Sequence, residues 1–342
     1  MPPRSSTKTA PSSGAPSGAP AAAPPPVPPA RRFPLPAVDA ATAAAELVTV
    51  RDFLRHAVSR FRSAGLVYGH GTTTAYDEAA FLVLETLQLP IDQLDPYLDA
   101  KLTPAERRLV AEIVEARVTT RKPAPYLTGR AYIQGVPFHV DERVIVPRSY
   151  IGELLFSDLF GGDGFTLVED PTEVGRVLDL CTGSGCLAIL AAGIFPDAMV
   201  DAVDLSPEAL EVARINVAEA GLEDRVSLIQ GDLFKPLKGR RYDVILTNPP
   251  YVSAEAMAEL PPEYRHEPQM ALGSGEDGLD IVRRILAEAH KHLTEEGGLL
   301  CEIGTGRAIL EAEYPDTEFT WLETAESFGE VFWLTREQLD DL

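Results

Sequence analysis

The feature that most constrains the fold is an alternation of short apolar segments with amphipathic ones that begins at Arg176. The apolar segments have the length of buried strands, and the segments between them are long enough for helices. Strands and helices that alternate at this spacing form βαβ units and therefore a parallel, doubly wound sheet. The expected strands are 177–180, 199–203, 226–229, 244–247 and 299–303, and the expected helices include 185–194 and 207–220.

Two later apolar runs complete the predicted sheet. Residues 319–322 and 331–334 are joined by a short stretch that contains a glycine, so we expect an antiparallel pair at the sheet's edge. Together with the five parallel strands they predict a seven-stranded, doubly wound α/β domain of the Rossmann-like class. We place this domain at 161–342, and its first residues, 161–173, form a loop rich in glycine and acidic residues.

The residues before this domain follow a helical pattern, and we expect a small helical domain over 44–128. Its clearest start signal is Thr103 as an N-cap, followed by Pro104 at the first helical position and Glu106 three residues after the cap. The expected helices are 46–64, 76–87 and the one after Thr103, whose apolar face would comprise Leu109, Val110, Ile113 and Val114.

A connecting region over 129–160 follows the helical domain. Apolar residues alternate on both sides of Asp141 and Glu142, which predicts a β-hairpin that turns at these two acids. Pro147 then opens a short amphipathic helix. The apolar residues of this region are Phe138, Val140, Val144 and Val146 in the hairpin, and Ile151, Leu154 and Leu155 in the helix.

The first 43 residues differ in composition from the rest of the chain. Twelve of the 29 prolines lie before residue 37, among Ala, Ser and Gly, and no acidic residue precedes Asp39. Such a segment cannot bury enough apolar surface to offset its ordering entropy, so we predict a disordered tail over 1–43. The tail lacks the apolar centre of a secretory signal. No apolar run in the chain approaches the roughly 18 residues that span a bilayer.

Charge and cysteine content limit the partners and the compartment. The formal net charge of −22 would repel naked nucleic acid and attract a strongly basic protein. Cys181, Cys186 and Cys301 form no CxxC pair, which favours the cytoplasm over a disulfide framework or a structural zinc site. His290 and His292 lie two apart in an expected helix and face different ways, so we expect no metal site.

The first motif that carries chemistry joins the first strand of the sheet to a helix, at Asp179-Leu-Cys-Thr-Gly-Ser-Gly-Cys-Leu-Ala188. Gly183 and Gly185 would let the backbone approach a ligand closely above the helix N-terminus. Asp204, nineteen residues after Gly185, ends the next strand and can accept both ribose hydroxyls of a nucleoside. The motif favours nucleoside binding over a turn without a ligand. It also satisfies the dinucleotide fingerprint, so it does not separate NAD from S-adenosylmethionine.

The second motif, Asn248-Pro-Pro-Tyr251, follows the fourth strand and faces the crevice where ligands bind in this architecture. An amide or aminopurine NH₂ is a poor nucleophile because its lone pair is delocalised. The side-chain oxygen of Asn248 and the carbonyl of Pro249 could each accept one NH₂ hydrogen, which points the lone pair at a sulfonium methyl. The prolines fix the backbone, and Tyr251 could pack on the flat target group. This motif therefore favours S-adenosylmethionine and methyl transfer to a planar nitrogen.

Two further stretches fit such a pocket less specifically. Asp232, after the third strand, could lie near the adenine amino group with Leu233 against the ring, although such a stretch is more often only a loop. The polar stretch 263–268 carries side chains suited to contact a substrate, and a solvated connector fits its composition equally well.

On these residues the chain resembles the glutamine amide-nitrogen methyltransferases of the HemK type, over roughly residues 45–340. Release-factor glutamine methyltransferases and adenine-amino DNA methyltransferases share the tetrapeptide. The remaining motifs look like the branch that modifies the third protein of the large ribosomal subunit, except that Tyr150 stands where that branch has proline. These motifs are Pro125-Tyr-Leu-Thr128, Val140-Asp-Glu-Arg-Val144, Val146-Pro-Arg-Ser149, Ile151-Gly-Glu-Leu154, Asp179-Leu-Cys-Thr-Gly-Ser-Gly-Cys186 and Tyr264-Arg-His-Glu-Pro268.

The resemblance implies an S-adenosylmethionine-dependent enzyme that methylates a glutamine of that basic ribosomal protein, and a helical domain that docks the substrate. It implies that Asn248, Pro249, Pro250 and Tyr251 form the catalytic tetrapeptide. The predicted cofactor-binding residues are Asp179, Cys181, Thr182, Gly183, Ser184, Gly185, Asp204, Leu205, Asp232, Leu233 and Asn248.

Four other functions stay open on the sequence. Release-factor methylation would use the same chemistry. Methylation of an adenine in nucleic acid is disfavoured by the negative charge. An NAD-dependent oxidoreductase would need a hydride-transfer site, which the sequence does not show. A noncatalytic ribosome-assembly factor could bind the same client protein. The leading hypothesis is a cytoplasmic methyltransferase that binds its ribosomal protein before assembly or on the ribosome, without a membrane or sequence-specific nucleic-acid contact.

Overall fold

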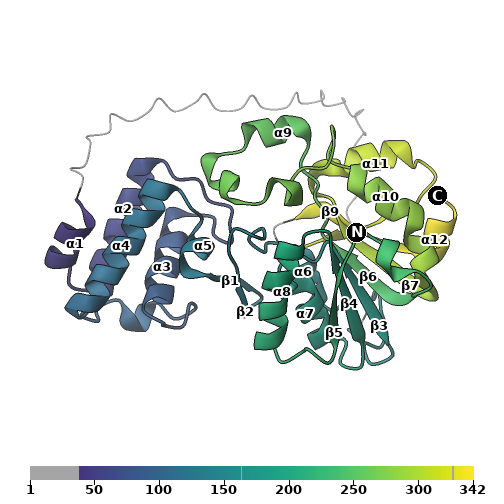
Figure 1. Cartoon of the computed structure of the whole chain (residues 1–342), viewed down its shortest axis with the longest axis horizontal. Helices are drawn as coiled ribbons and strands as arrows, with labels where there is room; N and C mark the ends of the chain where they lie inside the picture. The colour runs from purple at the N-terminus through teal and green to yellow at the C-terminus, as the bar shows by residue number, and fades with distance from the viewer. Residues whose placement is uncertain (1–37, 163, 326) are drawn as a thin grey trace, which may run out of the picture. The chain divides into compact units, whose positions relative to one another are not determined.

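The described residues of the chain form a seven-stranded sheet with helices on both faces, as predicted (Figure 1). The computed structural model describes residues 38–162, 164–325 and 327–342, and Ala37–Leu342 form one compact unit. The strands are β3 (Arg176–Leu180), β4 (Met199–Asp204), β5 (Val226–Gln230), β6 (Tyr242–Thr247), β7 (Leu293–Glu302), β8 (Thr320–Glu323) and β9 (Phe328–Thr335).

The strand order is β5-β4-β3-β6-β7-β9-β8, and the first five strands in this order are parallel. The chain runs outward from β3 through β4 to β5 and then returns to place β6 on the other side of β3. This reversal makes the point between β3 and β6 the topological switch point, where doubly wound sheets bind ligands outside the carboxyl ends of the strands. β9 pairs antiparallel with both β7 and β8, so the predicted antiparallel pair at the edge is confirmed.

Each central strand contributes alternate residues to two separate cores, because successive side chains of a strand point to opposite faces. Val177 lies in the core that includes helix α7, whereas Leu178 lies in the core that includes helix α10. The sheet is therefore covered on both sides, as the near-continuous apolar strands predicted. The connecting region contains α6 (Ile151–Leu155), which begins at Ile151, so the prediction that Pro147 opens this helix is wrong. The later helices are α7 (Cys186–Ile194), α8 (Pro207–Glu219), α9 (Ala254–Glu259), α10 (Asp280–Ala289), α11 (Arg307–Glu313) and α12 (Arg336–Asp340).

The helices before the sheet largely follow the sequence pattern, with one helix added. The helix expected at 46–64 begins later, at Val50, because Thr49 caps it through a capping box with Asp52. A separate helix that was not predicted begins at Ala40, inside the predicted tail, so the prediction of disorder is wrong for residues 40–43. Residues 1–37 of that tail lie outside the described residues. The helices are α1 (Ala40–Glu46), α2 (Val50–Ala64), α3 (Ala75–Thr86), α4 (Pro104–Thr120) and α5 (Ala124–Thr128).

The N-terminus of α4 is confirmed in detail, whereas its apolar face is narrower than predicted. The Thr103 side chain accepts the Glu106 N–H, and the Glu106 carboxylate accepts the Thr103 N–H at 2.7 Å. Val110 and Val114 are buried, but Leu109 is 54% exposed. Leu109 was therefore wrongly assigned to the core.

The β-hairpin exists, but its turn lies seven residues earlier than the sequence pattern suggested, at 134–135 instead of 141–142. β1 (Arg130–Ile133) pairs antiparallel with β2 (Val136–His139), and the turn is Gln134-Gly135. Both turn residues have positive φ, 48° and 77°, which a two-residue hairpin turn of this kind requires and which glycine adopts readily. Asp141 instead holds Arg143 in a side-chain ion pair after the second strand.

No helix in the described part of the chain is long and apolar enough to cross a membrane.

Candidate active site

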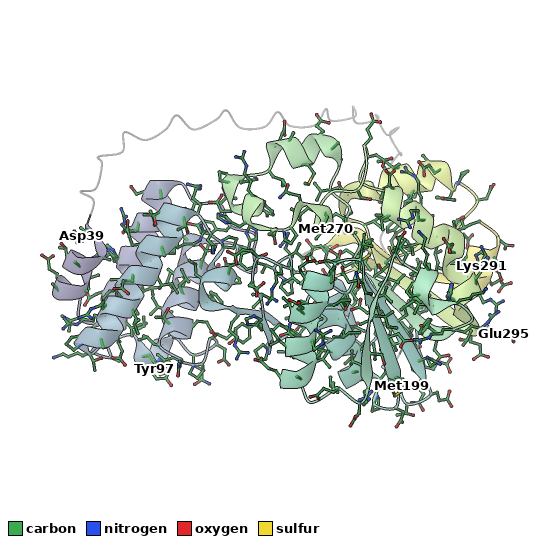
Figure 2. The ribbon with its side chains drawn as sticks, in the orientation of Figure 1. Asp39, Tyr97, Met199, Met270, Lys291 and Glu295 are labelled. Atoms are coloured by element: carbon green, nitrogen blue, oxygen red, sulfur yellow. The ribbon has the colours of Figure 1, made fainter. Side chains whose placement is uncertain are left out.

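A cavity of about 170 Å³ opens at the carboxyl ends of the parallel strands, around the switch point between β3 and β6. Figure 2 labels Met199, at the start of β4, at one end of the sheet and Met270, which lines the cavity, towards the other. The predicted site residues that line it are Cys181, Gly183, Asp204, Leu205, Asp232, Leu233, Asn248 and Pro250. The predicted site residues that do not line it are Asp179, Thr182, Ser184, Gly185, Pro249 and Tyr251.

Asp179 supports the loop after β3 from beneath. Its carboxylate Oδ2 accepts the Thr182 hydroxyl at 2.5 Å and the Ala188 N–H at 3.0 Å. The residue is fully buried, and this burial raises the pKa of Asp179 to about 7. Oδ1 is buried without a hydrogen-bond partner among the described residues. Asp179 therefore holds the loop in place through Oδ2, and its Oδ1 remains without a hydrogen-bond donor among the described residues.

Glycine is favoured at the two positions 183 and 185 of this loop for different structural reasons. Both have positive φ, 55° at Gly183 and 80° at Gly185. A Cβ on Gly185 would lie 3.1 Å from the Cβ of Ala213 in α8, so this glycine permits close helix packing. A Cβ on Gly183 would meet nothing within 4 Å. Gly183 lines the cavity, and its backbone is open to a ligand there.

Asp204 holds the loop and keeps acceptors available at the end of β4. One carboxylate oxygen accepts the Gly183 N–H at 2.8 Å, and the other accepts the Ser206 N–H at 2.9 Å. A carboxylate has about four lone-pair positions, so two remain for the hydroxyls of a ribose. Burial raises the pKa of Asp204, against the effect of these backbone donors.

Two residues that are not glycine have left-handed backbone conformations at the cavity wall. Cys181 has φ 60° and Leu233 has φ 50°. Such conformations cost about 1–3 kcal/mol and persist where the surroundings hold them, often at ligand sites. Both side chains line the cavity.

The Asp232 carboxylate is already engaged at the edge of the cavity. Arg284 on α10 donates to one of its oxygens and Lys235 to the other, both at 2.6 Å. The hydrogen bond from Lys235 and that from Arg284 lower the pKa of Asp232. A ligand amino group that binds the Asp232 carboxylate would therefore be a third donor to it, beside Lys235 and Arg284.

Asn248 directly follows β6 and faces the cavity. The preceding Thr247 donates its hydroxyl to the Leu180 carbonyl at 3.0 Å, which ties the end of β6 to the end of β3. The Asn248 side-chain amide makes no hydrogen bond to any residue that the structure describes. Pro249 is buried and Pro250 lines the cavity beside Asn248. The amide oxygen is therefore free to accept a hydrogen from a ligand.

Tyr251 is held by residues that the sequence reasoning did not identify. Its hydroxyl donates to Glu302 Oε1 at 3.1 Å, and its ring lies on Gly304, where a Cβ would approach to 2.8 Å. The other Glu302 oxygen accepts the Ser149 hydroxyl at 2.6 Å and the Tyr150 N–H at 2.9 Å. No spacing rule connects Glu302 with Tyr251, because Glu302 ends β7 and Tyr251 lies in the loop after β6, and the two meet only in the folded sheet.

The cavity also has a wall that the sequence reasoning missed. It comprises two segments outside the sheet, and the residues concerned are Arg143, Val144 and Ile145 from the linker, and Pro268, Met270, Ala271 and Gly273 from the segment after the tetrapeptide.

Neither interpretation of the stretch 263–268 fits its two glutamates. The stretch was expected either to contact a substrate or to be a solvated connector. Glu263 and Glu267 are instead buried in ion pairs with arginines. An arginine-paired interior carboxylate looks, in the sequence, like any surface glutamate, so no local signal could have identified them.

The cavity fits a nucleoside that carries a charged amino-acid tail, as S-adenosylmethionine does. Asp204 offers free lone pairs for ribose, Leu205 and Leu233 offer apolar contacts for a base, and the loop 181–185 lies above the N-terminus of α7. Among the described residues there is no group of three side chains that could hold a metal ion.

Comparison with known proteins is consistent with this geometry. Residues 166–260 match the family model described as the methyltransferase small domain. The chain is 58% identical over 297 residues to the ribosomal protein uL3 glutamine methyltransferase of Bradyrhizobium diazoefficiens, covering 86% of this chain and 93% of that protein. It is 56% identical over 295 residues to the protein of the same name from Bordetella pertussis, covering 86% and 97%.

Among solved structures, the chain is 25% identical to TrmN from Thermus thermophilus, with a TM-score of 0.35, over 47% of this chain and 43% of that one.

Proposed function

The chain belongs to the family of ribosomal protein uL3 glutamine methyltransferases, and on that basis we propose that it methylates the side-chain amide nitrogen of a glutamine in ribosomal protein uL3 with S-adenosylmethionine as the donor. The observation that carries this proposal is the Asn248 amide, which lines the cavity at the switch point beside Asp204 and has no hydrogen-bond partner among the described residues. An unpaired amide oxygen beside such a cavity is suited to receive an NH₂ group.

The chemistry requires the chain to orient a weak nucleophile. When bound, S-adenosylmethionine supplies an electrophilic methyl group on a sulfonium. Asn248 Oδ1 and the Pro249 carbonyl would each accept one hydrogen of the glutamine NH₂, which directs its lone pair towards the methyl group. These acceptors need no reorganisation, because Pro249 and Pro250 restrict the backbone and Thr247 anchors it to β3.

No strong base is needed before the methyl transfer, because the nitrogen becomes acidic as it gains positive charge. The Asn248 oxygen would accept a hydrogen bond from an N–H of the newly methylated nitrogen. Solvent can then take that proton. Tyr251, held by Glu302 and Gly304, would pack on the planar amide of the substrate. The residues that would hold the cofactor are those of the loop after β3, together with Asp204, Leu205, Asp232 and Leu233.

We further propose that the helical residues 44–128 dock the protein substrate and that the reaction takes place in the cytoplasm. The net charge of −22 suits a basic ribosomal protein. The three cysteines, all free thiols in the structure, suit a reducing compartment.

The test is a methylation assay with the full chain, labelled S-adenosylmethionine and three acceptors: unmodified uL3, an unmodified release factor and DNA. We expect label on a single glutamine of uL3, located by peptide mass spectrometry. Asn248→Ala should lower kcat by about 100-fold or more, because it removes one preorganised acceptor. It should retain cofactor binding in calorimetry, since Asn248 contributes one of many residues to the cavity wall.

Label on the release factor alone would retain the mechanism and contradict the proposed substrate. Label on DNA adenine would contradict the substrate class. An Asn248→Ala variant that methylates uL3 at the wild-type rate would contradict the role given to the tetrapeptide.

A further inference from the structure

The missed wall of the cavity comprises two segments that belong to neither the sheet nor its covering helices. One is 143–145 in the linker, and the other is 268–273, which follows the short helix η3 (Pro262–His266). The two segments are far apart in the sequence. The 268–273 segment is held to the residue after the tetrapeptide by an isolated bridge between Gly273 and Val252, but among the described residues no strand pairing joins it to 143–145. The contact between the two segments therefore needs a separate tie.

Glu267 provides this tie, because it immediately precedes one segment and binds the residues that follow the other. Its Oε1 accepts the Val146 N–H at 2.9 Å, directly after Ile145. Arg148 forms a bidentate pair with the same carboxylate, with Nη1 2.6 Å from Oε1 and Nη2 2.9 Å from Oε2. Arg148 also donates to the Val146 carbonyl at 3.0 Å. The carboxylate is fully buried, where such charge-assisted contacts are strong.

The same carboxylate reaches the helical part of the chain. His70, in the connection between α2 and α3, places Nε2 3.4 Å from Glu267 Oε2, and its side chain is only 1% exposed. The Tyr264 ring lies 4.3 Å from the His70 ring, and the Arg148 guanidinium lies 5.6 Å from the centre of the Tyr264 ring. Glu267 is therefore shared by three parts of the chain: the cavity wall, the linker and the helical region.

We propose that Glu267 is a positioning residue that holds the 143–145 and 268–273 segments together as the wall of the cofactor cavity and joins that wall to the helical region. This inference rests on the proposed function, because the cavity's ligand is taken to be S-adenosylmethionine. Glu267 itself does not line the cavity, so it acts through Arg148 and Val146 and not by touching the cofactor.

The chain contains a matched control in the same segment. Glu263 is also fully buried and also binds arginine, with Oε1 2.8 Å from Arg121 Nη2 and 3.1 Å from the Val67 N–H. All of these partners belong to the helical region. Glu263 therefore anchors the segment to the helical region as Glu267 does, but it makes no contact with the linker segment that forms the cavity wall.

The experiment compares Glu267→Gln with Glu263→Gln in the full chain. Both changes keep the side-chain volume and remove one buried negative charge, so both should lower the melting temperature. Binding of S-adenosylmethionine is measured by calorimetry, and kcat and KM by uL3 methylation. We expect Glu267→Gln to weaken cofactor binding by about tenfold or more and to raise the KM for S-adenosylmethionine equally, with kcat within about threefold of wild type. Glu263→Gln should bind the cofactor within about twofold of wild type.

Arg148→Lys is the second variant, which keeps the positive charge but loses the bidentate contact. It should weaken cofactor binding in the same direction by a smaller factor of about three, and it decides the matter if Glu267→Gln does not fold.

Equal weakening in the two glutamate variants would overturn the inference, because general loosening of the segment would then explain it. Wild-type cofactor binding in both Glu267→Gln and Arg148→Lys would overturn it as well. A wild-type protein that binds no S-adenosylmethionine would contradict the proposed function first, and this inference with it.

Discussion

Glu302 shows how a single buried carboxyl organises a site at the scale of one residue. It ends β7, has no exposed surface, and receives hydrogen bonds from Ser149, Tyr150 and Tyr251. These donors stabilise its charged form, but burial has the larger effect and raises the pKa of Glu302 from its ordinary value of 4.5 to about 7. The tyrosine of the Asn-Pro-Pro-Tyr tetrapeptide is therefore positioned by a group that titrates near neutral pH.

This raised pKa predicts how stability depends on pH. Between pH 4.5 and 7 the folded protein keeps a proton on Glu302 that the unfolded chain has released. The contribution of this carboxyl to the free energy of unfolding is complete below pH 4.5 and is lost as pH rises through 7, by about 1.4 kcal/mol per pH unit. Glu302→Gln should remove this decline, so its stability relative to wild type should improve with rising pH. Urea unfolding between about pH 5 and pH 8 measures the difference.

Glu296→Gln is the control for this prediction, because Glu296 lies on the same strand with an exposed side chain. It should keep the wild-type dependence of stability on pH. A Glu302→Gln protein whose unfolding free energy runs parallel to wild type over this range would show that Glu302 is ionised throughout.

At the scale of the element, the helix starts are determined by local chemistry. Both α2 and α4 begin with a reciprocal capping box, formed by Thr49 with Asp52 and by Thr103 with Glu106. Each box satisfies backbone N–H groups that the helix itself leaves unpaired. The first box was overlooked because the apolar pattern continues across it, so the predicted helix began at residue 46 instead of at Val50.

Thr103→Ala should lower the free energy of unfolding by about 1 kcal/mol, because it removes the side-chain acceptor at the start of α4. Thr119→Ala is the matched control near the end of the same helix, where the hydroxyl of the exposed threonine donates to the Glu115 and Ala116 carbonyls of its own helix. It should change stability by less than about 0.5 kcal/mol. Chemical denaturation measures both values, and equal losses in the two variants would contradict the capping argument.

At the scale of the whole molecule, the net charge of −22 is the dominant electrostatic property. Some of the basic residues form ion pairs with buried carboxylates, as Arg117 does with Glu78 and Arg148 with Glu267. The remaining field attracts a basic partner over a distance that salt controls.

The proposed uL3 substrate therefore predicts a salt dependence. Raising the ionic strength from about 0.1 M to about 1 M shortens the screening length from roughly 10 Å to roughly 3 Å. The KM for uL3 should rise several-fold over this range, and the KM for S-adenosylmethionine should change by less than about twofold, because the small cofactor carries only a single net positive charge whereas uL3 is strongly basic. Initial rates at varied salt provide the measurement. A KM for uL3 that is independent of salt would contradict electrostatic attraction of the substrate.

The sequence by itself determined the class of fold and the order of the strands along the chain, and it supplied the proposal for the tetrapeptide. These features are local: the periodicity of apolar residues identifies strands and helices, and the glycines after β3 and the residues 248–251 occupy loops whose position follows from the topology. The starts of α4 and α8 were predictable for the same reason, because a cap involves residues at most a few positions apart.

The tertiary structure alone decided which residues support the site. Glu302 meets Tyr251, and Glu267 meets Val146 and Arg148, across 51 to 121 residues of chain. The local sequence around a glutamate does not predict whether an arginine or a tyrosine will contact it in the folded protein. The hairpin turn, the exposed Leu109 and the wall of the cavity were misjudged or missed for a related reason. Each depends on what packs against it, and the energy of burying a side chain is a property of the folded neighbourhood and not of the residue.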